Sequence, residues 1–311
     1  MKRVLTALVL IPVVLLVLFK APMWLFTLVV GVVAIGAAWE YLQLVHSYGA
    51  DTLKRVTLLL IAFLYVPLAL MDAFAHESRF LEAISLATVL VVLIGGPLLM
   101  LAVVMSFEKT SAALPAASLS WMAMPYVGLT LVCLPLLRAN PAGVFYILYL
   151  FVVVWSGDIF AYYVGRSFGK NKLAPRISPG KTWEGAVASL AGSAVLGTAL
   201  FMYSDHIMQF LAGWGLGVKD NLYLTFIPSG RFNPASRQET LITAILLSIT
   251  VNACAQVGDL VESMIKRGAN VKDSGTLLPG HGGILDRIDA LLFAAPIVYF
   301  YSLSYYPSIR L

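Results

Sequence analysis

Long apolar runs constrain this chain more than any other feature of its sequence. About nine apolar runs, each roughly long enough for a membrane-spanning helix, lie near 4–19, 22–39, 56–75, 81–105, 115–137, 142–164, 186–203, 240–262 and 290–306. A helix needs about 20 mainly apolar residues to cross the hydrocarbon core of a bilayer. The chain is 60% hydrophobic and only 12% charged, which is outside the usual range for soluble domains. We therefore predict an all-α, polytopic integral membrane protein with about nine transmembrane helices.

The distribution of Lys and Arg predicts how this protein is oriented in the membrane. With nine spans and a cytoplasmic N-terminus, 14 of the 21 Lys and Arg residues fall on the cytoplasmic side. This asymmetry agrees with the positive-inside rule and places the C-terminus in the periplasm. The net charge of +5 is explained by this topology and by anionic headgroups, and the sequence shows no signature of nucleic-acid binding.

The two halves of the chain differ in where they carry polar residues. Residues 1–140 consist of apolar helices with short, weakly charged connections, whereas residues 141–311 carry polar residues within and between the spans. We expect one continuous membrane domain whose catalytic region is 141–311. Residues 204–239 form the longest candidate loop on the non-cytoplasmic side. Small residues such as those at 191–197 allow helix packing within or between chains, so a homodimer is possible.

Ionisable residues gather in SMIKRGANVKDSGTLLPGHGGILDRIDA, Ser263–Ala290, between two apolar runs. Asp286 and Asp289 share a helical face if a helix begins just before them. Gly282 and Gly283 would let backbone N–H groups converge on a phosphate without obstruction by side chains. The other ionisable residues singled out here are Lys266, Arg267, Lys272, Asp273, His281 and Arg287.

The preceding apolar run carries a polar stripe along one helical face, made of Asn252, Gln256, Asp259 and Ser263. A carboxylate near the membrane end of an apolar helix usually faces a polar cavity or a partner. Asp259 and Asp286 could meet across two helix ends and hold Mg²⁺, a hard ion that takes one or two carboxylates together with water and phosphate oxygens. The alternative is that Asp259 pairs with a nearby Lys or Arg and holds two helices together.

A second basic loop, GRSFGKNKLAPRISPGKTWEG, spans Gly165–Gly185. Its GKT is not a Walker A loop, because Pro175 stands where that motif has its first glycine and no strand is expected before it. Its basic residues suit a nucleoside triphosphate or a phospholipid headgroup, or else form a solvated positive-inside loop. The residues favoured for a specific role are Ser178, Lys181, Thr182 and Glu184.

Asp158, in WSGDIFAYYVG, is a third acid within an apolar span. Its place near the predicted cytoplasmic end indicates one shared polar cavity that opens to the cytoplasm, where Asp158 would bind a second cation or orient Lys181. Carboxylates, cations and glycines at one membrane face favour phosphoryl or nucleotidyl transfer onto a lipid. Such chemistry depends on positioning and on neutralisation of charge.

The stretch S-x-x-K-R-x-x-x-x-K-D-x-G-x-x-L-P-G-H-G-G-x-x-D-R-x-D, Ser263–Asp289, resembles the signature of the phosphatidate cytidylyltransferase family, also called CDP-diacylglycerol synthases. G-D-L-V-E-S at Gly258–Ser263 and S-P-G-K-T-W-E-G at Ser178–Gly185 also resemble that family. The resemblance implies that CTP and phosphatidic acid give CDP-diacylglycerol and pyrophosphate. It also implies a location in the bacterial inner membrane.

The resemblance further implies roles for individual residues. Asp259 and Asp286 would be the metal-binding carboxylates, with Mg²⁺ as the catalytic ion and room for a monovalent cation such as K⁺. The catalytic set is Asp259, Asp286, Lys266, Arg267 and Asp289. The substrate-binding set is Ser178, Lys181, Thr182, Glu184, Lys272, Asp273, His281, Gly282, Gly283, Arg287 and Asp158.

Two other functions remain open at this point. A CTP-dependent lipid kinase would use similar metal and phosphate chemistry but would move the γ-phosphate to an alcohol, and the complete signature at 263–289 disfavours it. A cation-coupled transporter would also place acids at helix ends within the membrane. It would not explain two phosphate-suited basic loops on one predicted face.

Overall fold

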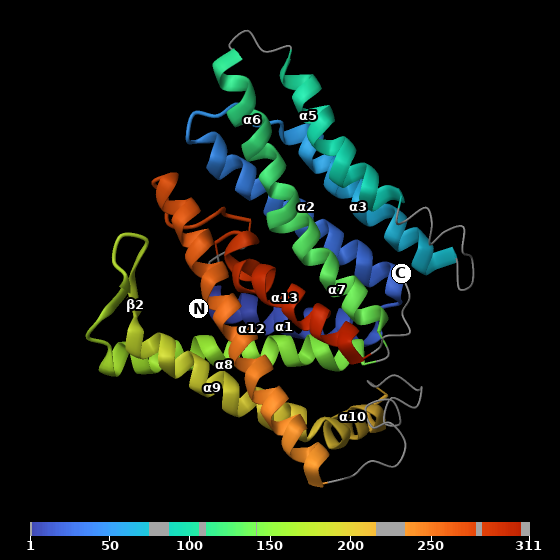
Figure 1. The fold of residues 1–311 in the computed structure, drawn as a ribbon, viewed down its shortest axis with the longest axis vertical. Helices are drawn as coiled ribbons and strands as arrows, with labels where there is room; N and C mark the ends of the chain where they lie inside the picture. The colour runs from blue at the N-terminus through green and yellow to red at the C-terminus, as the bar shows by residue number, and fades with distance from the viewer. Residues whose placement is uncertain are drawn as a thin grey trace. The chain divides into compact units, whose positions relative to one another are not determined.

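The computed structural model describes residues 2–74, 87–105, 110–140, 142–215, 234–277 and 282–305, and these residues are mainly helical (Figure 1). The chain divides into two compact units. The first contains residues 1–135 and 264–288, and the second contains residues 136–263 and 289–311. Helices dominate because a bilayer offers no partners for backbone N–H and C=O groups, which a helix satisfies within itself.

The first unit is built from the helices of the N-terminal half. They are α1 (Lys2–Lys20), α2 (Met23–His46), α3 (Lys54–Phe74), η1 (Val91–Gly95), α5 (Gly96–Val104), α6 (Thr110–Ala123), η2 (Met124–Gly128) and most of α7 (Leu129–Ala139). Helix α2 packs against α3, and α5 packs against α6. The buried side of α2 is lined by small residues such as Ala34, Ala37 and Ala38, which let neighbouring helices approach closely. The Tyr65 hydroxyl donates to the Gly128 carbonyl at 2.9 Å, which ties α3 to η2.

The second unit holds α8, a small hairpin and the helices that follow it. Its elements are α8 (Gly143–Phe168), β1 (Lys172–Ala174), β2 (Ser178–Thr182), α9 (Trp183–Met202), α10 (Ser204–Gly213) and most of α12 (Pro234–Gly268) and α13 (Leu285–Tyr305). Helices α8 and α9 pack along each other. The Ser193 hydroxyl donates to the Val153 carbonyl at 2.7 Å, so a polar contact joins the two helices.

Six helices are long and apolar enough to cross a membrane, judged by length and composition over the described residues. They are Met23–His46, Ala87–Val104, Ser111–Ala139, Gly143–Phe168, Trp183–Met202 and Thr240–Gly268. Each matches one of the predicted runs. The runs near 4–19, 56–75 and 290–306 are also helical, as α1, α3 and α13, but they are not among the six. The prediction of a helical, polytopic membrane protein is confirmed, and the number nine stays a prediction.

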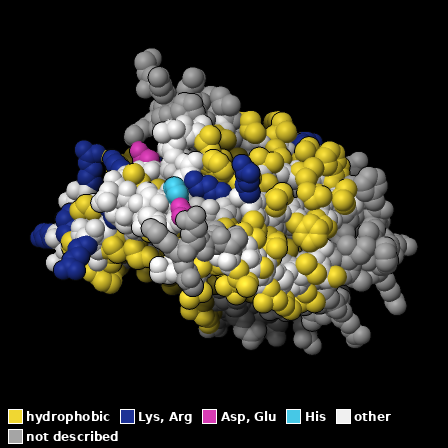
Figure 2. Space-filling view, turned by 90° about the horizontal axis from the view of Figure 1, so that it is seen from above, with side chains coloured by type: hydrophobic (Ala, Val, Ile, Leu, Met, Phe, Trp, Pro, Cys, Tyr) yellow, Lys and Arg dark blue, Asp and Glu magenta, His cyan; other side chains and the backbone are white. Residues whose placement is uncertain are grey.

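Apolar side chains are also exposed in the way that a lipid environment favours. Large hydrophobic side chains such as Leu59 and Phe168 are each 70% exposed. Figure 2 shows hydrophobic side chains over wide areas of one face, with a group of Lys and Arg side chains at its left edge. Apolar surface on this scale marks contact with a membrane or a partner.

Two local predictions were wrong. No strand was expected before the GKT segment, yet β1 and β2 form an antiparallel hairpin that pairs Lys172 with Thr182 and Ala174 with Ser178. These strands are too short for their alternation to be recognised in the sequence. The segment 204–239 was expected to be a loop, yet α10 occupies its start and α12 begins at Pro234. Proline is well suited to the first turn of a helix, so α12 extends beyond its apolar part.

Candidate active site

The hairpin is tied to the first turn of α9 by side chains on both sides. Thr182 caps α9, since its hydroxyl accepts from the Gly185 N–H at 3.2 Å. The Glu184 carboxylate accepts from the Asn171 side chain at 2.8 Å and from the Asn171 N–H at 3.2 Å. An acidic residue in the first turn also complements the helix dipole. These contacts fix the end of β2, and with it Lys181.

Lys181 pairs with Asp259 across the second unit. Its Nζ lies 2.5 Å from Asp259 Oδ2, and the two side chains are 26% and 37% exposed. The Ser263 hydroxyl donates to the other carboxylate oxygen of Asp259 at 3.3 Å. The sequence left open that Asp259 pairs with a nearby Lys or Arg. The structure contains such a pair. Its setting is a cavity, so the pair is accessible to a ligand.

This cavity has a volume of about 790 Å³ and is lined by α8, the hairpin, α9 and α12. It brings together five residues that were predicted for the site, namely Asp158, Ser178, Lys181, Thr182 and Asp259. Arg166 and Lys172 add two more basic side chains to its lining. The volume falls within the range of sites for small molecules and cofactors, and the lining favours an anion.

A hydrogen-bonded group of amides and hydroxyls forms another part of the lining. Asn252 Oδ1 accepts from the Ser189 hydroxyl at 3.0 Å and from Gln256 Nε2 at 2.8 Å. Asn252 is only 2% exposed and lies against Gly157 of α8, where a Cβ atom would fall 1.9 Å from its Nδ2. Ser189 was not singled out in the sequence. The group joins α8, α9 and α12, the helices that border the cavity.

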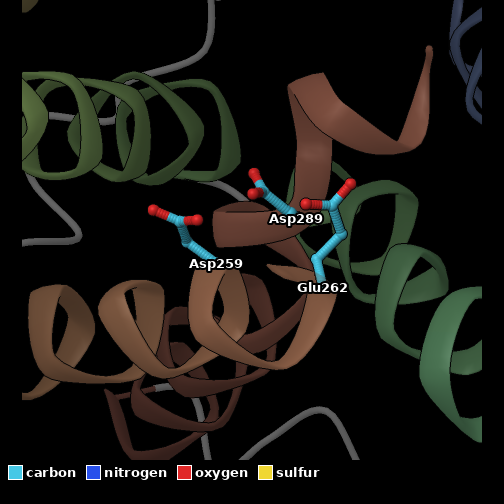
Figure 3. Close-up of side chains that lie close together, drawn as sticks. All are labelled: Asp259, Glu262 and Asp289. Carbon is cyan, nitrogen blue, oxygen red and sulfur yellow. The ribbon is translucent and has the colours of Figure 1, made fainter. Parts of the chain in front are cut away.

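Three carboxylates gather where α12 meets α13. Asp259 and Glu262 lie one turn apart on α12 and Asp289 lies on α13, with one oxygen of each within 4.8 Å of the others (Figure 3). The helices come close at Gly258, where a Cβ atom would fall 2.4 Å from the Asp289 carbonyl oxygen. Oxygen donors of this kind fit a hard divalent cation. Glu262 was missed in the sequence, although its i+3 spacing from Asp259 was a signal that could have found it.

In the first unit, Asp286 in the first turn of α13 joins the end of α12 to Ser274 and Gly283. Its Oδ1 pairs with Lys266 Nζ at 2.6 Å, and its Oδ2 accepts from the N–H groups of Ser274 and Gly283 at 2.9 and 2.8 Å. Gly282 adopts a positive φ of 82°, which allows this turn. The Gly283 N–H thus donates to a carboxylate in this structure. A phosphate contact at Gly283 and a metal at Asp286 stay predictions.

The remaining predicted residues lie in or beside the same loop. Arg267 Nη1 donates to the Val271 carbonyl at 3.1 Å. Lys272, Asp273 and Arg287 are exposed, and their contacts with substrate stay predictions. His281 lies outside the described residues.

The fold and the site define a mainly helical membrane protein with a cavity suited to phosphates beside carboxylates suited to a divalent cation. Residues 1–305 match the model of the cytidylyltransferase family. Over 309 residues the chain is 35% identical to a phosphatidate cytidylyltransferase of Haemophilus influenzae, covering 96% of this chain and 98% of the relative.

Two further relatives with the same name match shorter stretches. The protein of Brucella abortus is 41% identical over 194 residues, which is 62% of this chain and 58% of the relative. The protein of Bacillus subtilis is 39% identical over 158 residues, which is 51% of this chain and 47% of the relative. The chain belongs to the cytidylyltransferase family, as its signature indicated, and it is a nucleotidyltransferase.

Proposed function

We propose that this chain transfers the cytidylyl group of CTP to phosphatidic acid, giving CDP-diacylglycerol and pyrophosphate. The observation that carries the proposal is the pair formed by Lys181 and Asp259 in a cavity of about 790 Å³, with Asp259 also part of a three-carboxylate cluster. The name shared by the relatives supports the same substrates.

The reaction is a direct displacement at phosphorus. A phosphate oxygen of phosphatidic acid attacks the α-phosphorus of CTP, and the bond from this phosphorus to the oxygen bridging to the β-phosphorus breaks. Pyrophosphate leaves with that oxygen. The protein needs to position both substrates and to neutralise their charge. We assign this to Lys181 in the cavity, and on the resemblance alone to Lys266 and Arg267.

We propose that Asp259, Glu262 and Asp289 bind Mg²⁺. The ion supplies Lewis-acid neutralisation of phosphate charge when bound. Glu262 is fully buried, so it can fix the geometry of the other two carboxylates. Asp286 remains a proposed ligand on the resemblance alone, as does a monovalent cation such as K⁺.

We also propose that the basic loops face the cytoplasm of a bacterial inner membrane. Support comes from the distribution of Lys and Arg and from the bacterial origin of the relatives. A periplasmic C-terminus follows if the chain has nine spans, although residues 306–311 lie outside the described residues. A homodimer remains a proposal from small residues such as those at 191–197.

The experiment uses purified protein in detergent with phosphatidic acid, Mg²⁺ and CTP labelled on the α or the γ phosphate. Label entering lipid from α-labelled CTP, with γ label released in pyrophosphate, supports cytidylyl transfer. Lipid labelled only from the γ position identifies a kinase and refutes the proposal. No transfer by the folded protein favours a transporter. Asp259→Asn serves as the inactive control.

A further inference from the structure

A buried carboxylate of the N-terminal half contacts both Ser274 and the start of α13, the helix that carries Asp286. Glu40 lies on α2 and is only 2% exposed. It accepts from the Ser274 hydroxyl at 2.9 Å and from the N–H groups of Ile284 and Leu285 at 3.0 and 2.9 Å. Residues separated by more than 230 positions are thus joined within the first unit.

Glycines allow the loop backbone to lie directly on this carboxylate. A Cβ atom at Gly275 would fall 2.4 Å from one oxygen of Glu40, and one at Gly283 would fall 2.2 Å from the other. One turn earlier on α2, a Cβ atom at Gly36 would fall 2.6 Å from the end of the Ile284 side chain. Gly36 on α2, and Gly275 and Gly283 opposite it, therefore allow the two segments to pack closely.

Ser274 connects Glu40 to Asp286. Its hydroxyl donates to Glu40 and accepts from the Asp286 N–H at 3.3 Å, and its own N–H donates to Asp286 Oδ2. Asp286 in turn pairs with Lys266 at 2.6 Å. A continuous chain of polar contacts therefore runs from α2 to the ammonium group of Lys266.

The cost of burying Glu40 indicates that its contacts are specific. An ionised carboxylate is expensive to bury unless several donors compensate it. Here it receives one hydroxyl and two N–H groups, and the N–H groups belong to the start of α13, where the helix dipole favours a negative charge. A helix cap needs only a local Ser, Thr, Asp or Asn. A cap supplied by α2 additionally fixes the loop relative to a distant helix.

We propose that Glu40 is a positioning residue for the ion pair of Lys266 and Asp286. This rests on the proposed function insofar as that loop contacts the substrates. Glu40 fixes the chain at two places, at Ser274 and at the start of α13. Asp286 can then orient the ammonium group of Lys266 toward a phosphate.

The test compares Glu40→Gln, Ser274→Ala and a matched control, Thr57→Val. Thr57 is also buried in the first unit, and among the contacts described its hydroxyl donates only to the Leu53 carbonyl, just before the start of α3. For each variant we would measure kcat and KM for CTP per folded molecule, the midpoint of thermal unfolding, and hydrogen exchange at the amides of Ile284 and Leu285.

For Glu40→Gln we expect kcat to fall about ten- to hundredfold, as for displaced catalytic groups, with KM for CTP changed less than about threefold. Exchange at both amides should accelerate. Ser274→Ala should act in the same direction, since it removes the hydroxyl donor of Glu40 and leaves the carboxylate with its two N–H donors from Ile284 and Leu285. Thr57→Val should lower the unfolding midpoint and leave kcat unchanged.

Unchanged kcat in folded Glu40→Gln with faster exchange would overturn the proposal and leave Glu40 as a structural cap. Unchanged exchange would show that Glu40 does not hold the loop, which also overturns it. Failure of the wild type to transfer label from α-labelled CTP would instead refute the proposed function. Hydrogen exchange would still decide whether Glu40 holds the loop.

Discussion

Replacing Gly258 by alanine tests whether close packing of α12 and α13 assembles the carboxylate cluster. The added Cβ atom would lie 2.4 Å from the Asp289 carbonyl oxygen and 3.1 Å from Phe293 Cδ2. The first neighbour is backbone and cannot rotate away. The helices must therefore shift until this contact reaches about 3.4 Å, the lower limit of ordinary van der Waals contact.

That shift is about 1 Å, which decides the expected effect. Mg²⁺ binds its oxygen ligands at about 2.0–2.1 Å in near-ideal octahedral geometry, so 1 Å exceeds what the site can absorb. We expect kcat to fall about a hundredfold and the Mg²⁺ requirement to rise. Overpacking should cost about 1–3 kcal/mol of stability, partly offset by about 1 kcal/mol from the better helix propensity of alanine.

The assay is transfer of α-labelled CTP onto phosphatidic acid over a Mg²⁺ titration, with thermal unfolding measured in parallel. Gly213→Ala is the matched control, since a Cβ atom at this glycine of α10 meets nothing within 4 Å. If Gly258→Ala keeps its kcat within about twofold of the wild-type value and its Mg²⁺ dependence is unchanged, the carboxylate cluster is not a metal site that depends on the close packing of α12 and α13.

Three further predictions concern the site. Lys181→Ala removes the ammonium group beside Asp259 and should raise KM for CTP about tenfold or more, since a charge-assisted contact contributes about 1.5–3 kcal/mol; an unchanged KM would contradict its role. Gly282→Ala should lower the unfolding midpoint, because φ is 82° and the Cβ atom would fall 2.5 Å from Asp286 Oδ2; a higher midpoint would argue against this turn. Chelation of divalent ions should abolish transfer and added Mg²⁺ should restore it, which a radiolabel assay checks directly; activity that persists in excess chelator would exclude a required divalent ion.

Local patterns in the sequence were sufficient for the class of protein, and they indicated several residues that the structure brings together in one cavity. Apolar runs predicted the helices, and helical spacing placed Asn252, Gln256 and Asp259 on one face, where all three line the cavity. Lys181 was predicted from the residue types in its loop and from the resemblance of S-P-G-K-T-W-E-G to the family, and it lies against Asp259.

Contacts between distant segments could not be predicted in this way. Glu40 bonds to residues 244 and 245 positions away, and no periodicity encodes such a contact. The N-terminal half was therefore interpreted as apolar helix without a role. The pairing of Lys181 itself was open, because spacing along the chain does not indicate which carboxylate a flexible side chain will meet.

The hydrogen-bonded group around Asn252 has a consequence for the insertion of the helices into the membrane during synthesis. An amide in the middle of a span is unfavourable in lipid unless a neighbouring helix supplies a partner. The Ser189 hydroxyl bonded to Asn252 belongs to α9, which precedes α12 in the chain. During synthesis, α9 therefore enters the membrane first and its hydroxyl is in place when α12 arrives. In a permuted chain that inserted α12 before α9, Asn252 would face lipid without this hydrogen-bond partner. The order of the helices in the chain therefore ensures that the partner of Asn252 is already in the membrane.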